Sequence, residues 1–213
     1  MIKELTLSME EIYYLGKLLG GKHINYRYIA AMPDISQNPK EHMQKCRNSL
    51  CDKGVLCENL WGDLEVDTGI KEFISPVFFG SFEASIEVVC LENPKQVESM
   101  YFHRNSKNCL ISVENGQQVS FSLADDETLG NIVFALMPVG YNELEKPKLS
   151  ELQNLNVQRM IIVKNIRINE NVSAEVFYEC KGWLCEMFEA EKYKILSPKQ
   201  FYDKVFNMLE GGF

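Results

Sequence analysis

The chain has 213 residues, of which 46% are hydrophobic, so it can bury a sizeable core as one large domain or two small ones, and its composition argues against disorder. A formal net charge of −8 disfavours a general nucleic-acid surface, because clustered Lys and Arg supply most of the affinity for a polyanion. The sequence has no apolar run of the roughly 18 to 20 residues that span a bilayer, and its seven cysteines form no regular framework, so we expect a cytoplasmic protein without membrane insertion.

The first segment with a clear pattern is a helix that begins at Ser8. Ser8 and Glu11 have the Ser-x-x-Glu spacing of a capping box, in which each side chain accepts a hydrogen bond from a free backbone N–H of the first turn. Apolar residues then recur at helical spacing on one face, and Gly20-Gly21 ends the helix.

Residues 38–66 predict a second helix followed by a short hairpin. Asn38 is a suitable N-cap, Pro39 fits the first helical position, and Gly54 fits the position that ends a helix. Two short strands are predicted on either side of Trp61-Gly62. A helix followed by a hairpin is the outline of a winged-helix module, so contact of this segment with DNA is an alternative that the sequence leaves open.

The charges of the helix and those of the hairpin favour different functions for this module. Its helix carries more basic than acidic residues, as a recognition helix would. Its hairpin carries acidic residues, which phosphates would repel, namely Glu58, Asp63, Glu65 and Asp67. A structural or protein-binding use is therefore the favoured interpretation. Asp67 also predicts the N-cap of a further helix, which we expect to end before Pro76.

A hairpin followed by an amphipathic helix occupies residues 109–137, and the chain is organised around this unit. Asn115-Gly116 is the dipeptide that best tolerates the positive φ angles of a tight hairpin turn. Asp125 and Asp126 supply an N-cap and a first-turn acid, and apolar residues follow at helical spacing. An earlier strand, with alternating apolar residues, begins at Phe82.

The same order recurs near the C-terminus. Strands are predicted over 160–168, 174–180, 183–188 and 192–195, and Ser197-Pro-Lys-Gln200 then starts a last helix with a second capping box. The segment Leu196–Leu209 aligns with Leu123–Leu136, which indicates a duplicated unit.

The pattern as a whole predicts an α/β fold of the α+β kind: a quasi-two-fold duplicated unit of antiparallel strands followed by an amphipathic helix, with an N-terminal helical, winged-helix-like segment. We expect a single domain over residues 1–213, made of two related halves. The N-terminal half is 1–137, including a helical segment over 1–75, the linker is 138–150, and the C-terminal half is 151–213.

The sequence contains no recognisable catalytic or metal-binding signature. His23, His42 and His103 are the available imidazole bases, and none lies in a known motif. The cysteines that follow His42 lack the paired Cys-x-x-Cys spacing of a structural zinc site, and no glycine-rich phosphate loop occurs. We therefore expect no enzyme activity, no metal and no cofactor.

The order of residues resembles the EspG family of type VII secretion chaperones and its Gram-positive relative EsaE. The resemblance is carried by a Leu-x-x-Glu-x-Ile-x-x-Leu helix at Leu7–Leu15, a Leu-x-x-x-Gly-Val-Leu segment at Leu50–Leu56, the hairpin Cys109–Leu123, and Leu-Ser-Pro-x-x-Phe from Leu196. It covers most of the chain and lies in pattern and order, without a diagnostic motif.

This resemblance implies a cytoplasmic chaperone or adaptor of two related α/β halves, which binds the helical tip of a secretion substrate and keeps it soluble for export. It implies a helical secreted partner, of the WXG type or associated with an LXG toxin in a Gram-positive bacterium, and no nucleic acid. Family members use the sheet surface and the C-terminal helical region, so the implied protein-binding residues here are Trp183, Phe188, Tyr193, Phe201 and Val205. The alternative function is a winged-helix transcriptional regulator with a C-terminal sensing domain, and the oligomeric state stays open.

Overall fold

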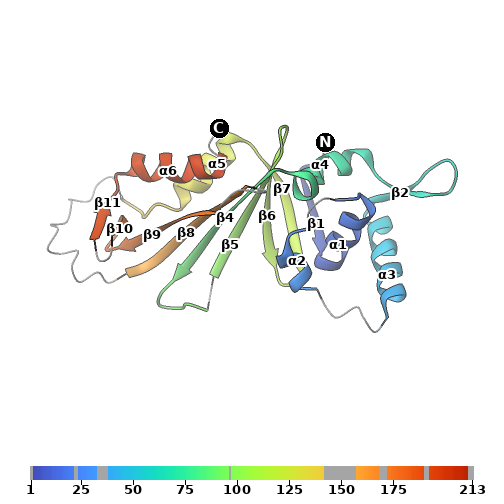
Figure 1. Ribbon diagram of the computed structural model, residues 1–213, viewed down its shortest axis with the longest axis horizontal. Helices are drawn as coiled ribbons and strands as arrows, with labels where there is room; N and C mark the ends of the chain where they lie inside the picture. The colour runs from blue at the N-terminus through green and yellow to red at the C-terminus, as the bar shows by residue number, and fades with distance from the viewer. Residues whose placement is uncertain are drawn as a thin grey trace. The chain divides into compact units, whose positions relative to one another are not determined.

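The computed structural model describes residues 2–21, 24–32, 38–95, 97–141, 157–167, 172–189 and 192–210 (Figure 1). The chain forms two compact units. Unit 1 comprises Met1–Ser81 and His103–Leu123, and unit 2 comprises Phe82–Phe102 and Ala124–Phe213. These boundaries differ from those of the predicted halves, 1–137 and 151–213. The relation between those halves stays a prediction, and most of the predicted linker 138–150 lies outside the described residues.

Unit 1 consists of helices and a hairpin beside three strands of a sheet. Its sheet strands have the order β1-β7-β6, and β1 pairs antiparallel with β7 so that Leu7 lies opposite Val119. Its elements in chain order are β1 (Glu4–Ser8), α1 (Met9–Leu18), α2 (Tyr26–Ala30), α3 (Pro39–Asp52), β2 (Leu56–Glu58), β3 (Leu64–Val66), α4 (Thr68–Phe79), β6 (Cys109–Asn115) and β7 (Gln118–Ala124).

The predicted start of the first helix is confirmed. The Glu11 backbone N–H donates to the Ser8 hydroxyl over 3.2 Å, and the Ser8 backbone N–H donates to Glu11 Oε2 over 2.6 Å, which completes the capping box. The apolar face of α1 then enters a core that it shares with α3, α4 and the strands, and that includes Ile12, Leu50 and Phe73. The strand β1, which leads directly into this helix, was not predicted.

The predicted helix and hairpin over residues 38–66 are also present, as α3, β2 and β3. The expected end of the following helix before Pro76 was wrong, because α4 continues to Phe79. Pro76 removes only one backbone donor, and the last turn of α4 buries Phe78 in the core. Burial of that ring offsets the lost hydrogen bond.

The described residues of unit 2 form antiparallel strands and the helices α5 and α6. Its strand order is β5-β4-β8-β9-β10-β11, and the pairs β4–β8, β8–β9, β9–β10 and β10–β11 are antiparallel. Its elements are β4 (Phe82–Cys90), β5 (Val97–Arg104), α5 (Asp126–Ala135), β8 (Val157–Arg167), β9 (Ser173–Cys180), β10 (Trp183–Glu189), β11 (Lys192–Ile195) and α6 (Pro198–Glu210).

The helix α6 closes the core of unit 2. Its start is the predicted second capping box, since the Ser197 N–H donates to Gln200 Oε1 over 2.9 Å and the Gln200 N–H donates to Ser197 Oγ over 3.2 Å. Phe201, Val205 and Leu209 recur every four residues and are fully buried. Figure 1 shows α5 and α6 together on one face of this unit's strands.

The predicted α/β fold of antiparallel strands, each set followed by a helix, is confirmed. The hairpin β6–β7 precedes α5, and the hairpin β10–β11 precedes α6. The predicted tight turn is present, and Gly116 has a positive φ of 64°, but Asn115 lacks the expected positive φ and is the last residue of β6. Of the helices in the described ranges, none is both long and apolar enough to cross a membrane.

Candidate functional site

The residues predicted to bind a partner all belong to unit 2, and three of them have side chains in its interior. Trp183 packs edge-on against Tyr141 with ring centroids 5.6 Å apart. Phe201 packs in the same way against Phe177 at 5.0 Å, and Val205 is fully buried on the same face of α6. These side chains contribute to the core of the unit.

The other two predicted residues lie on the neighbouring strands. Tyr193 on β11 is half-buried and packs edge-on against Tyr178 on β9, with centroids 5.9 Å apart. Phe188 lies within β10, but its side chain is outside the described part of the chain. The predicted role of the five residues in partner binding stays a prediction.

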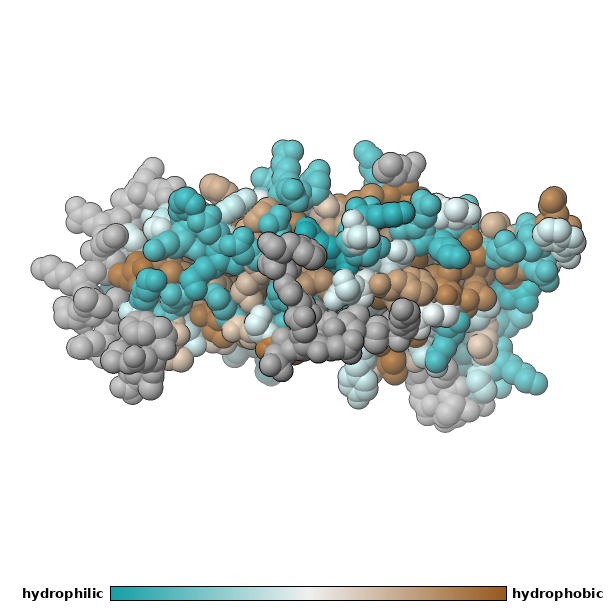
Figure 2. All heavy atoms as spheres, turned by 45° about the horizontal axis from the view of Figure 1, so that its top comes forward, coloured by the Kyte–Doolittle hydropathy of each residue, from teal (hydrophilic) through white to brown (hydrophobic). Residues whose placement is uncertain are grey.

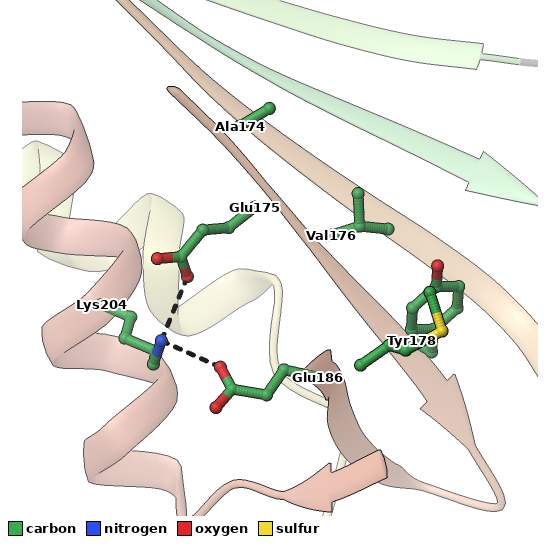
Figure 3. A pocket seen from close by; sticks show the side chains of 7 residues that line it. Ala174, Glu175, Val176, Tyr178, Glu186 and Lys204 are labelled. Carbon is green, nitrogen blue, oxygen red and sulfur yellow. Dashed lines mark hydrogen bonds and ion pairs between the residues drawn. The ribbon is translucent and has the colours of Figure 1, made fainter. Parts of the chain in front are cut away.

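A groove of about 400 Å³ lies beside Tyr178, between β9, β10 and α6 (Figure 3). Its walls combine apolar and charged side chains, listed in chain order as Ala174, Glu175, Val176, Tyr178, Glu186, Met187 and Lys204. In Figure 3 the two glutamates extend from the strands toward Lys204 on the helix.

The charges of the groove are paired with one another. Lys204 Nζ lies 2.9 Å from Glu186 Oε2 and 3.4 Å from Glu175 Oε2, and Lys194 Nζ lies 3.6 Å from Glu186 Oε1. The hydrogen bond to Glu186 raises the pKa of Lys204 above its ordinary value, so Lys204 is charged at neutral pH. The groove thus offers paired ions and an apolar wall, which suits contact with a protein surface.

A second feature of unit 2 is an aromatic row across α5 and α6, which we define as Phe134, Tyr202 and Phe206. The Phe134 and Tyr202 rings meet edge-on at 6.2 Å, and the Tyr202 and Phe206 rings stack at 5.4 Å. Phe134 is exposed, and the other two are half-buried. Gly130 lets the two helices approach, because a Cβ there would lie 2.8 Å from the Tyr202 hydroxyl. An exposed aromatic ring held in place by half-buried rings is typical of protein interfaces.

A serine–histidine pair occurs in unit 1, but its geometry does not suit catalysis. Ser112 Oγ lies 3.0 Å from His103 Nε2, and both side chains are buried together with the Tyr28 hydroxyl. Burial, together with the nearby Arg27 guanidinium, lowers the pKa of His103 to about 3. The imidazole is therefore neutral and enclosed, and the pair forms a polar anchor within the core.

The described residues contain no group of three or more His, Cys, Asp or Glu side chains that could hold a metal ion. His42 instead lies 3.3 Å from Glu10, between α3 and α1. Cys46 is buried, and burial raises the pKa of its thiol to about 11, whereas a zinc ligand is a thiolate.

Sequence reasoning did not identify the groove or the aromatic row. The glutamates 175 and 186 and Lys204 come from three elements, so no local spacing connects them. The aromatic row had a partial signal, because Tyr202 and Phe206 are four residues apart and lie beside the apolar stripe of α6.

Comparison with known proteins finds no matching family model and no curated protein of similar sequence. Among solved structures, the chain is similar to EspG5, a type VII secretion system chaperone of Mycobacterium tuberculosis whose structure was determined in complex with a PE25–PPE41 dimer. The two share 9% sequence identity with a TM-score of 0.60, over 98% of this chain and 96% of EspG5. The resemblance to the EspG family that the sequence indicated is thus confirmed for the fold: the chain has an EspG-like fold.

Proposed function

We propose that this chain is a chaperone or adaptor of a type VII secretion system, which binds a helical secreted protein in the cytoplasm and keeps it soluble until export. The observation that carries the proposal is the fold, shared with a secretion chaperone over 98% of this chain. The chaperone of that structure was solved bound to a PE25–PPE41 dimer, which supports a secreted protein partner. A WXG-type protein, or a protein associated with an LXG toxin, is the finer form of the proposal.

The surface that we assign to this partner is on unit 2. The aromatic row provides one exposed ring, Phe134, and two half-buried rings at low cost in conformational entropy, since the rings already hold one another in place. The neighbouring side of α6 provides the groove, and Met187 there is exposed and adapts its shape readily. Covering an apolar helical tip stabilises the complex by roughly 25 cal/mol per Å² of apolar area removed from water.

The first experiment is purification of the tagged chain from its native cytosol at low and at high salt, with identification of the bound molecules. The proposal expects a small helical secreted protein at both salt concentrations, because an apolar contact depends little on ionic strength. That protein should lose solubility when it is produced without this chain. Recovery of DNA alone, lost at high salt through counterion release, would favour the winged-helix regulator and contradict the chaperone.

A second experiment separates the aromatic row from the rest of the surface. The double variant Phe134→Ala, Tyr202→Ala should lower partner affinity at least tenfold, because aromatic contacts at interfaces are often hot spots. The matched control is Val139→Ala, which removes an apolar side chain that is fully exposed in the same unit. The variant Tyr193→Ala tests whether Tyr193, one of the residues that the sequence resemblance implied, contributes to partner affinity. Equal affinity of the double variant and the control would remove the aromatic row from the proposal.

A further inference from the structure

The hairpin β2–β3 of unit 1 ends in two large apolar side chains that are largely exposed. Leu60 is 97% exposed and Trp61 is 84% exposed, whereas the second tryptophan of the chain, Trp183, is 8% exposed. Figure 1 shows the hairpin projecting from the helices of unit 1, and Figure 2 shows apolar atoms at its tip. An adjacent pair of exposed large apolar residues on a projecting turn is unfavourable unless it serves an interaction.

The turn that carries these side chains is held in one conformation by Asn59. The Asn59 side-chain oxygen accepts hydrogen bonds from the backbone N–H groups of Trp61 and Asp63, each over 2.9 Å. The Asn59 N–H donates to the Asp63 carbonyl over 2.8 Å, and the Gly62 N–H donates to the Asn59 carbonyl over 3.0 Å. Gly62 has a φ of 85°, which favours glycine. The tip is therefore preorganised, which lowers the entropy cost of binding.

The surroundings of the tip are acidic. Glu58 and Asp63 flank it, and Glu65 accepts a hydrogen bond from the Asn59 side-chain amide over 2.8 Å. Residues 55–67 include no Lys, Arg or His. Such a tip is repelled by DNA phosphates and by anionic lipid headgroups. It is complementary to an apolar pocket with Lys or Arg at its rim, because charges at a rim steer association.

We propose that the β2–β3 hairpin is an interaction knob that inserts Leu60 and Trp61 into an apolar, basic-rimmed pocket on a protein partner. The knob lies in unit 1, whereas the surface assigned to the secreted partner lies in unit 2. The inference does not rest on the proposed function, and a chain that fails to bind a secreted protein could still carry the knob.

The probe for this knob is a phage-displayed library of small three-helix domains whose surface positions are randomised, selected on the full chain. Most selected domains should lose binding at least tenfold to Trp61→Ala or Leu60→Ala, because hot spots favour buried tryptophan. They should keep full affinity for Tyr26→Ala, which removes an aromatic ring that is 78% exposed elsewhere in unit 1. Their selected positions should be enriched in Lys or Arg around apolar residues.

Two further readouts test the same inference. The fluorescence emission of Trp61 should shift to shorter wavelength on binding, with Trp183→Phe used to remove the second signal. Both hairpin variants should unfold at the same temperature as the parent chain, since the side chains at the tip have no packing to lose. The inference is overturned if selected domains bind the hairpin variants as tightly as the parent chain. It is also overturned if the tip binds phosphatidylcholine–phosphatidylglycerol vesicles and no library domain.

Discussion

Lys53 at the end of α3 reaches the nearly buried carboxylate of Glu11 in α1, with its Nζ 2.6 Å from Glu11 Oε2. The Ser49 hydroxyl donates to the other oxygen, Oε1, over 2.7 Å, and the Ser8 N–H donates to Oε2. A residue that caps one helix thus also connects that helix to a second one. The local capping box and the tertiary contact depend on the same side chain.

Removal of either partner of this ion pair should destabilise unit 1 by different amounts. Lys53→Ala leaves a buried carboxylate that keeps its other donors, and we expect a loss of about 2 kcal/mol in the free energy of unfolding. Glu11→Ala also removes the cap, and we expect about 3 kcal/mol. Urea unfolding followed by tryptophan fluorescence measures both values. The control is Glu41→Ala, whose pair with Lys45 is exposed to solvent, so its loss should change the free energy of unfolding much less than either of the other two substitutions. Equal losses of unfolding free energy in all three variants would contradict the role of the Lys53–Glu11 ion pair in stabilising unit 1.

Acid should destabilise the chain through His103. Its pKa in the folded state is lowered to about 3 from an ordinary value of 6.5, by burial and by Arg27. Between these two pKa values, His103 binds a proton in the unfolded chain but not in the folded chain. The folding stability present above pH 6.5 is therefore lost as the pH falls toward 3. The expected slope approaches about 1.4 kcal/mol per pH unit.

The measurement is the free energy of unfolding at several pH values between the two pKa values of His103, in the parent chain and in His103→Gln. The variant costs some stability at every pH, so the comparison is of slopes. A smaller slope in the variant supports the assignment, because glutamine does not titrate. Identical slopes would show that His103 does not carry the effect.

Gly80, at the end of α4, should not tolerate a side chain. A Cβ at this position would lie 2.2 Å from the Pro76 carbonyl oxygen and 2.7 Å from the Arg104 carbonyl oxygen, both of which are backbone atoms. Gly80→Ala should therefore lower the stability by about 3 kcal/mol or more, since the backbone has to move. Gly69→Ala in the first turn of the same helix meets only side-chain atoms, the Asp67 carboxylate at 3.2 Å and Ile2 Cδ1 at 3.9 Å, and we expect a change below about 1 kcal/mol. Thermal unfolding of both variants tests this order.

The cysteines should react in two classes. Cys57 and Cys90 are exposed, whereas Cys180 and Cys185 are buried on neighbouring strands of unit 2. The hydrogen bond with Cys180, with burial, raises the pKa of Cys185, so its thiolate is scarce near neutral pH. A disulfide-exchange reagent should modify Cys57 and Cys90 in the folded chain and the buried pair only after denaturation. Variants Cys57→Ser and Cys90→Ser should each remove one fast equivalent, and fast reaction of Cys180 or Cys185 in the double variant would contradict the burial of these two thiols.

The sequence by itself determined the helix starts and the tight turn, because each depends on side chains within a few residues of one another. The capping boxes Ser8–Glu11 and Ser197–Gln200 and the Asn115-Gly116 turn are therefore visible as spacing alone. Much of the order of strands and helices, though not the strand β1, follows from the same local patterns, and with it the class of fold.

The tertiary structure decided which side chains are at the surface. A strand shows which residues share a face, but not whether a helix covers that face, and α6 covers the one that includes Phe177. In the same way, contacts with other elements bury Trp183, Phe201 and Val205. Their apolar character alone would equally suit an exposed interface. The groove joins residues from β9, β10 and α6, and the knob at Trp61 is recognised only from the exposure of its side chains in the folded chain. Such features depend on contacts between residues distant in the chain, which local spacing does not record.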